Sequence, residues 1–205
     1  NSKSMSPPGS ADTAGSSEDD GVSEAETAAV GGSAAAIAVD GLELVYSDGT
    51  AAVRGIEMGV PEGEFFGFLG PNGAGKTTTI KVFATLLSPT SGAVRVNGFD
   101  VRSAPREIRK SIGYMAQETS IDPELTAEEN IRFACEAHGV PREERSERVT
   151  ELLDLVDLAD VAGKRAEEFS GGMKKRLDAA TALVHRPPLV FLDEPTPGRA
   201  PKPRN

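Results

Sequence analysis

One glycine-rich segment could hold a phosphate group. Gly70 is followed, after four residues, by Gly75, Lys76 and Thr77, which is the pattern G-x-x-x-x-G-K-S/T. Glycines at such positions let the backbone wrap around a phosphate with several N–H groups pointing inward. The lysine ammonium would reach the β- and γ-phosphates of a nucleotide, and the threonine hydroxyl would be a ligand for Mg²⁺. We therefore expect the nucleotide to contact Gly70, Pro71, Asn72, Gly73, Ala74, Gly75, Lys76, Thr77 and Thr78.

Two acids near the end of the chain would complete such a site. Asp193 and Glu194 directly follow the apolar run 189–192, which is typical of a buried strand that ends in carboxylates. Asp193 is placed to hold Mg²⁺, and Glu194 to polarise an attacking water as general base. Because many buried strands end in solvated acids, this pair points to catalysis only when it is taken together with the glycine loop.

The elements around these residues alternate between strand and helix. The expected strands are 37–46, 51–60, 64–69, 93–96, 112–115 and 189–192. The expected helices are 79–87, 142–158 and 170–184. The second lies within a charged helical region at 122–168, and the third follows that region. The run 64–69 has the apolar character of a strand buried on both faces, and it leads directly into the glycine loop. This order predicts an α/β core with a helical insertion.

Composition limits the possible partners. The chain has 22 Lys and Arg against 32 Asp and Glu, a net charge of −10, which argues against duplex nucleic acid as a partner. No stretch approaches the 18 or so consecutive apolar residues that a membrane span needs. The single cysteine, Cys135, excludes an internal disulfide, and we expect its side chain to be buried. These features favour an intracellular protein.

The first 36 residues differ from the rest. They are rich in Ser, Gly and Ala, and their six acids and one lysine give −5, half of the net charge. Such a segment buries too little apolar area to offset the entropy lost on ordering, so we expect residues 1–36 to be a disordered acidic tail. It lacks the basic start and apolar centre of a signal peptide.

A third segment indicates the class of nucleotide-binding protein. Phe169-Ser170-Gly171-Gly172-Met173 resembles the signature motif of ATP-binding cassette (ABC) proteins, usually Leu-Ser-Gly-Gly-Gln. A serine-capped helix start with two glycines is suited to grip a phosphate. In that family the motif faces the γ-phosphate held by the partner subunit. The resemblance therefore implies a homodimer in which Ser170, Gly171 and Gly172 contact ATP.

Two single residues extend the resemblance. Gln117, in the segment 112–118, resembles the family's Q-loop glutamine, which touches magnesium and the attacking water and links the core to the helical subdomain. Tyr46, thirty residues before Lys76, resembles the aromatic residue that stacks on adenine. The resemblance thus implies Lys76, Gln117 and Glu194 as catalytic residues, and Thr77, Gln117 and Asp193 as magnesium ligands.

The resemblance covers about residues 37–196 and implies a P-loop NTPase (RecA-like) core, an antiparallel β subdomain and a helical signature subdomain at about 120–170. It implies ATP and Mg²⁺ as cofactors, and a transmembrane permease as the partner of a cytoplasmic ATPase subunit on the inner face of the cell membrane. The run 172–178 resembles the multidrug-exporter branch, and daunorubicin-resistance ATP-binding subunits above all. The ATP-binding subunits of polysaccharide, lipid and sodium exporters share this sequence pattern.

The sequence departs from the family pattern after Pro195-Thr196, where the family continues with Thr-Gly-Leu-Asp. Residues 197–205 are proline-rich and basic, and Ala200 stands in place of the D-loop aspartate. We therefore expect a truncated chain that lacks the C-terminal part of the core, binds ATP weakly and hydrolyses it slowly.

Two other classes share part of the pattern. A soluble ABC ATPase with a regulatory or translation-linked role would carry the same motifs without a membrane partner, and it remains the alternative. A small GTPase or kinase would share the glycine loop, but no Asn-Lys-x-Asp guanine motif occurs and the segment 170–173 would be unexplained. An ATPase subunit of a membrane exporter accounts for all the motifs.

Overall fold

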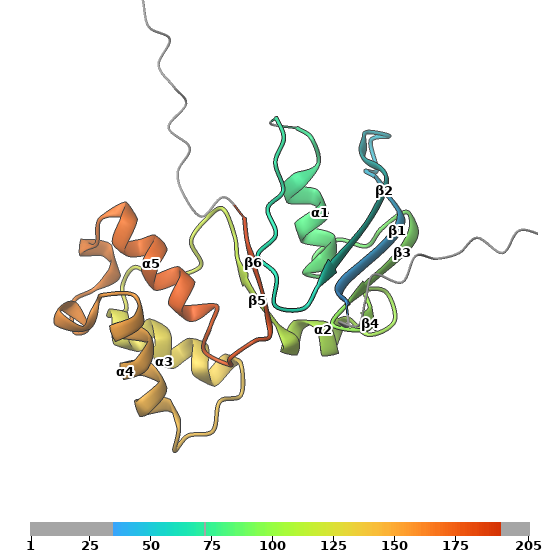
Figure 1. The fold of residues 1–205 in the computed structure, drawn as a ribbon. Helices are drawn as coiled ribbons and strands as arrows, with labels where there is room; N and C mark the ends of the chain where they lie inside the picture. The colour runs from blue at the N-terminus through green and yellow to red at the C-terminus, as the bar shows by residue number, and fades with distance from the viewer. Residues whose placement is uncertain (1–34, 72, 194–205) are drawn as a thin grey trace, which may run out of the picture. The chain divides into compact units, whose positions relative to one another are not determined.

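The computed structural model describes residues 35–71 and 73–193 (Figure 1). The expected tail lies outside the described residues except for Ala35 and Ala36, which are the first residues of a strand and not part of a tail. Asn72, Glu194 and the segment 197–205 also lie outside them.

Four antiparallel strands form one sheet, in the order β2-β1-β3-β4. Their bounds are β1 Ala35–Val45, β2 Ala51–Pro61, β3 Ser91–Val96 and β4 Phe99–Asp100. The long strand β1 pairs with both β2 and β3. Its apolar residues Ile37, Val39, Leu42 and Leu44 are buried. Alternate side chains of a strand point to the same face, and an irregularity between Val39 and Leu42, where Gly41 has φ 57°, brings the second pair onto the face of the first. This sheet is the expected antiparallel β subdomain.

Helix α1 (Lys76–Phe83) starts at the end of the glycine loop and packs on this sheet (Figure 1). Val82 and Phe83 are fully buried in one cluster with residues of β1 and β3. The helix ends earlier than the expected residue 87, since Thr85 adopts a left-handed conformation with φ 59°. The N–H groups of Leu86 and Leu87 then both donate to the carbonyl of Lys81, which closes the helix end.

A second sheet contains two parallel strands, β5 (Ile112–Met115) and β6 (Leu189–Leu192). Helix α2 (Pro105–Ser111) leads directly into β5. Phe191 of β6 packs against Phe83 of α1, so this parallel pair belongs to the same core as the antiparallel sheet. The strand expected at 189–192 is therefore present, and it ends one residue before Asp193.

The strand predicted at 64–69 is wrong. This segment has no regular secondary structure, and the side chains of Phe65 and Leu69 are 98% and 97% exposed. An apolar run becomes a strand only where neighbouring strands take up its backbone N–H and C=O groups. Neither described sheet includes these residues, and only Phe68 packs against the core.

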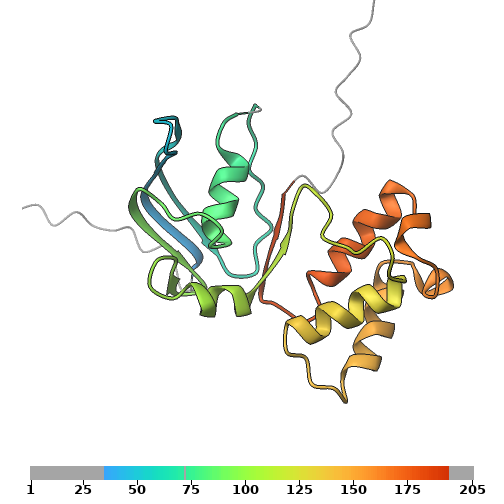
Figure 2. The ribbon, with the colours of Figure 1, turned by 180° about the vertical axis from the view of Figure 1, so that it is seen from behind.

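Three helices and two 3₁₀ turns pack around a second hydrophobic cluster. Figure 2 shows the ribbon of these helices from behind. Their bounds are α3 Ala127–Ala137, α4 Arg145–Leu155, η1 Ala159–Val161, η2 Ala166–Glu168 and α5 Gly171–Thr181. A capping box between Thr126 and Glu129 fixes the start of α3. Cys135 is completely buried in this cluster, as its residue type predicted. Among the described residues, no helix is long and apolar enough to cross a membrane.

Candidate nucleotide-binding site

The glycine loop enters α1 through a residue that must be glycine. Gly75 has φ 82° and ψ 5°, which is the left-handed region. A Cβ atom at this position would lie 2.5 Å from the carbonyl oxygen of Ala52 in β2. No side chain caps the first turn of α1, so its N-terminal N–H groups are left for another acceptor.

A cavity of about 500 Å³ lies against the start of α1, within the size range of small-molecule sites. It brings together residues that are far apart in the sequence, from Tyr46 through the glycine loop to Gln117. The residues that line it are Tyr46, Thr50, Ala51, Ala52, Gly73, Gly75, Lys76, Thr77, Thr78 and Gln117.

Thr77 and Asp193 meet across 116 residues of sequence. The Thr77 hydroxyl donates to Asp193 Oδ1 at 2.9 Å. Asp193 is only 3% exposed, and its backbone N–H donates to the carbonyl of Met115 at 3.0 Å, which extends the β5–β6 ladder by one step. Its second carboxylate oxygen, Oδ2, is buried and has no hydrogen-bond partner among the described residues.

This pair fits a magnesium ion. Mg²⁺ prefers oxygen ligands, and it is bound in proteins by one or two carboxylates together with substrate phosphates. A buried carboxylate oxygen without a donor is costly unless a cation or a further hydrogen bond satisfies it. The charge of Asp193 is also felt by Tyr114, since burial and, secondly, this carboxylate raise the pKa of the tyrosine hydroxyl.

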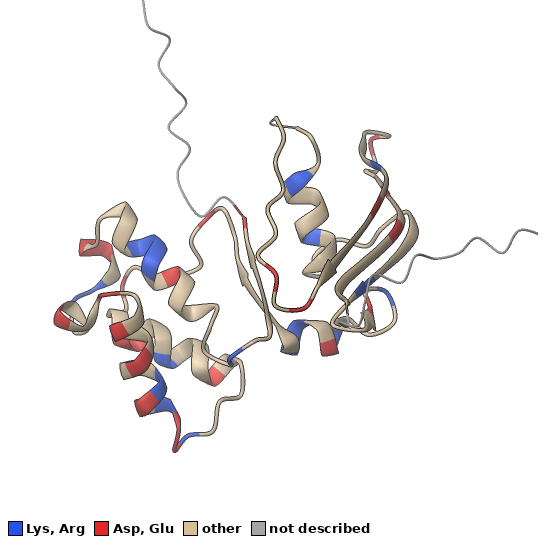
Figure 3. Cartoon of the chain, in the orientation of Figure 1, with Lys and Arg blue, Asp and Glu red and all other residues tan. Residues whose placement is uncertain are grey.

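Lys76 is held by the loop itself. Its ammonium donates to the carbonyls of Gly70 and Pro71 at 2.7 and 2.8 Å. Helix α1 carries Lys76 and Lys81 and no acidic residue, so both charged side chains on this helix are basic (Figure 3). A phosphate oxygen would be a stronger acceptor for the ammonium than these neutral carbonyls.

Tyr46 lies at the edge of the cavity. Its hydroxyl shares a hydrogen bond of 3.0 Å with the hydroxyl of Thr78, and its side chain is partly exposed. A partly exposed aromatic ring can receive a flat ligand on its face. Two expected members of the site, Asn72 and Glu194, lie outside the described residues.

The signature segment does not line this cavity. Ser170 caps helix α5, and its hydroxyl accepts from the N–H of Met173 at 3.3 Å. Gly171 and Gly172 are exposed, and a Cβ atom on either would meet nothing within 4 Å. The start of α5 therefore presents open backbone N–H groups to the solvent side of the molecule.

Sequence reasoning missed a polar contact between α5 and the segment after Gln117. Asp178 is buried in α5, and its carboxylate accepts hydrogen bonds from Ser120, 58 residues earlier. The only sequence signal is an acid between the apolar residues Leu177 and Ala180, which a helical pattern alone does not connect with any partner.

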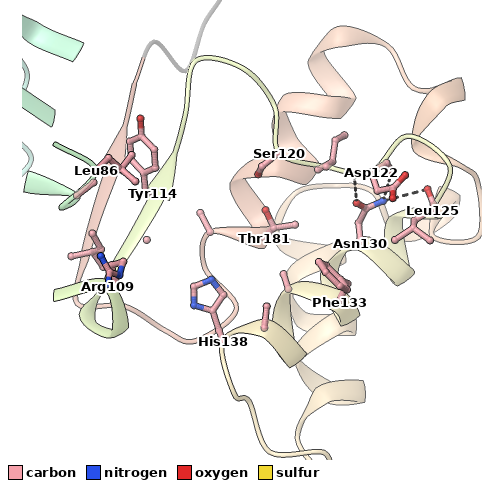
Figure 4. Close-up of a pocket in the computed structure, with 17 residues that line it drawn as sticks. Leu86, Arg109, Tyr114, Ser120, Asp122, Leu125, Asn130, Phe133, His138 and Thr181 are labelled. Atoms are coloured by element: carbon pink, nitrogen blue, oxygen red, sulfur yellow. Dashed lines mark hydrogen bonds between the residues drawn. The ribbon is translucent and has the colours of Figure 1, made fainter. Parts of the chain in front are cut away.

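A second cavity, of about 440 Å³, lies between β5 and the helices α3 and α5. Figure 4 shows Tyr114 and Arg109 on one side of it and Phe133 on the other. The ring of His138, which also lines it, stacks on His185 with ring centres 4.2 Å apart and planes 5° apart. Burial lowers the pKa of both imidazoles, and His185 Nε2 lies 3.0 Å from the carbonyl oxygen of Ile112.

Comparison with known proteins identifies the family of the chain. The chain matches the ABC transporter family over residues 53–197, and it belongs to this family. It is 45% identical over 170 residues to the daunorubicin/doxorubicin resistance ATP-binding protein DrrA of Streptomyces peucetius, covering 83% of this chain and 51% of that protein. It is 39% identical over 148 residues to the probable multidrug ABC transporter ATP-binding protein YbhF of Escherichia coli, covering 72% of this chain and 26% of that protein.

A solved structure supports the fold. The ATP-binding cassette MJ0796, solved as a dimer in a post-hydrolysis state bound to ADP and Pi, has a TM-score of 0.71 and 28% identity. The match covers 78% of this chain and 74% of that one. The P-loop NTPase fold with an antiparallel β subdomain and the resemblance to drug-resistance ATP-binding proteins are thus confirmed. The chain spans about half the length of the Streptomyces relative.

Proposed function

We propose that this chain is the ATP-binding and ATP-hydrolysing part of an ABC exporter for drugs or other hydrophobic compounds. The hydrogen bond from Thr77 to the buried Asp193 carries the proposal, because it joins the glycine loop to a carboxylate that still has an open oxygen. The printed names of the Streptomyces and Escherichia relatives, which refer to drug resistance and multidrug transport, support the class of cargo.

The predicted side chains of the site have separate roles in this proposal. Lys76 leaves the carbonyls of the loop and binds the β- and γ-phosphates of ATP, while the ring of Tyr46 receives the adenine. Thr77, Gln117 and Asp193 hold Mg²⁺, which when bound would neutralise charge on the phosphates. Gln117 also orients the attacking water. Glu194, outside the described residues, accepts its proton.

A second copy completes the site in this proposal. Ser170, Gly171 and Gly172 are exposed and do not line the cavity of their own chain, so they are free to face the nucleotide bound by another copy. The dimeric form of the similar cassette MJ0796 supports this arrangement. Closure of the dimer on ATP would drive a separate transmembrane permease subunit, which places the chain in the cytoplasm on the inner face of the cell membrane.

The dimer can be tested by analytical ultracentrifugation of the purified chain with and without ATP and Mg²⁺. We expect ATP to favour a dimer, and we expect Gly171→Trp to prevent dimerisation while leaving nucleotide binding by the monomer intact, because Gly171 is exposed and away from the cavity. A chain that binds ATP and stays monomeric at every concentration would contradict the shared site.

Export can be tested in the organism that carries the gene. Disruption of the gene should increase sensitivity to daunorubicin-like compounds, and a wild-type copy should restore resistance. A copy with Lys76→Ala should fail to restore it, because this lysine is the cation of the phosphate loop. Full restoration by that copy would show that resistance does not depend on ATP binding at this loop.

A further inference from the structure

Helix α5 is hydrogen-bonded to the segment that contains Gln117, a residue of the nucleotide cavity. One oxygen of the Asp178 carboxylate, Oδ1, accepts from the Ser120 N–H at 3.0 Å and from the Ser120 hydroxyl at 2.7 Å. The ammonium of Lys175 donates to the backbone carbonyl of Gln117 itself. Positions three residues apart lie on the same side of a helix, so Lys175 and Asp178 reach this segment together.

The remaining polar contacts fix the chain just beyond this segment. Asn130 of α3 accepts from the Asp122 N–H at 2.8 Å and donates to the Asp122 carbonyl at 3.0 Å (Figure 4). Ser120 and Asp122 are therefore anchored to two different helices, by Asp178 and by Asn130. Of these two anchors, only Asp178 lies on the helix that also contacts Gln117, about one turn from Lys175.

The buried carboxylate of Asp178 costs more free energy than a purely structural contact requires. Asp178 is 1% exposed, and its second oxygen, Oδ2, has no hydrogen-bond partner among the described residues. Burial of a charged group that is only partly satisfied costs free energy. A buried group of this kind therefore needs an explanation other than stability.

We propose that Asp178 is a positioning residue for Gln117, which together with Lys175 holds residues 117–120 against α5 so that the glutamine side chain faces the nucleotide cavity. This inference rests on the proposed function, since it concerns the nucleotide site. The same helix begins with Ser170-Gly171-Gly172, only eight residues before Asp178, which is about 12 Å along a helix axis. The signature segment and the residues that anchor the segment of Gln117 therefore belong to one helix.

The chain offers a selective probe for this inference. Gln117 is the only glutamine in the sequence, so labelling with ¹⁵N-glutamine gives a single side-chain amide in an NMR spectrum. In the wild-type chain, we expect this amide signal to shift when Mg²⁺ and ADP are added. In Asp178→Ala, the signal should differ from wild type already without nucleotide, and the response to Mg²⁺ and ADP should be lost. The affinity for ADP should change little, because the glycine loop is intact.

Two further variants separate positioning from general destabilisation. Asp178→Asn keeps an oxygen that can accept both bonds from Ser120, so we expect it to retain most of the amide response. Asn130→Ala removes comparable buried hydrogen bonds from α3 and should lower stability without moving the Gln117 signal. If Asp178→Ala does not fold, Ser120→Ala and Lys175→Met replace it, since each removes one of the contacts.

The inference is overturned if Asp178→Ala, or both replacement variants, leave the Gln117 amide signal and its response as in the wild-type chain. It is also overturned if Asn130→Ala moves the signal as strongly as Asp178→Ala. A wild-type chain that binds no ADP would refute the proposed function instead. The comparison of nucleotide-free spectra would still decide whether Asp178 positions Gln117.

Discussion

Replacement of Gly75 by alanine would place a methyl group against the backbone of strand β2. The new Cβ would lie 2.5 Å from the Ala52 oxygen and 3.5 Å from a methyl carbon of Val53, so either the loop or the strand must move. A left-handed backbone costs a residue other than glycine about 1–2 kcal/mol. Overpacking of a close contact adds about 1–3 kcal/mol. We expect Gly75→Ala to lower the free energy of unfolding by about 3 kcal/mol in total.

Gly73→Ala is the matched control. Gly73 has nearly the same φ, 83° against 82°, but a Cβ atom there would meet nothing within 4 Å. The free energy of unfolding of this variant should fall only by the cost of the left-handed backbone, about 1–2 kcal/mol. Urea unfolding followed by far-UV circular dichroism would measure both values without nucleotide. Equal destabilisation of the two variants would refute the conclusion that the β2 carbonyl confines Gly75.

Three further predictions concern other described residues. Thr77→Val removes the donor to Asp193, and we expect the free energy of unfolding in urea to fall by about 1–3 kcal/mol. We also expect Mg²⁺ to increase the nucleotide affinity of this variant no longer; an unchanged increase would contradict the metal site. Burial lowers the pKa of His138 and His185 below the ordinary value of 6.5, so the unfolded chain takes up protons first on acidification. The stability they contribute is therefore present above about pH 6.5 and is lost as the pH falls through that value and on toward the lower folded-state pKa values. His138→Gln should flatten this loss in thermal melts, and equal slopes would contradict it. Cys135 is completely buried and burial raises the pKa of its thiol, so a thiol reagent should label it slowly and only through opening of the helical cluster; rapid labelling of the native chain would contradict the packing.

The sequence predicted the elements whose pattern is local. Alternating apolar residues located β1, the turn at Asp48-Gly49 located β2, and the apolar run before Asp193 located β6. Each of these strands pairs with another described strand. The run 64–69 carries an equally strong apolar signal, yet it forms no strand, since pairing depends on neighbours that a local pattern does not contain.

Helix ends and long-range polar contacts escaped prediction for related reasons. Helix α4 ends at Leu155, before the expected residue 158, because Asp157 adopts a left-handed conformation and Arg176 of α5 donates to the carbonyls of residues 156 and 157. The stacking of His138 on His185 likewise joins residues with no common motif. Most cavity residues are predicted from motifs, but Thr50, Ala51 and Ala52 are not, because they approach the glycine loop only in the packed structure. Asp178 likewise belongs to no motif, and only the packed structure shows its partner.

The central claim is that the glycine loop binds a nucleotide together with Mg²⁺. Isothermal titration of the chain with ADP, with and without Mg²⁺, tests it most directly, with Lys81→Ala as the control because Lys81 lies on the same helix but does not line the cavity. We expect saturable binding of one ADP per chain, strengthened by Mg²⁺, unchanged in Lys81→Ala and lost in Lys76→Ala. Binding of equal strength in Lys76→Ala, or no saturable binding by the wild-type chain, would contradict the claim.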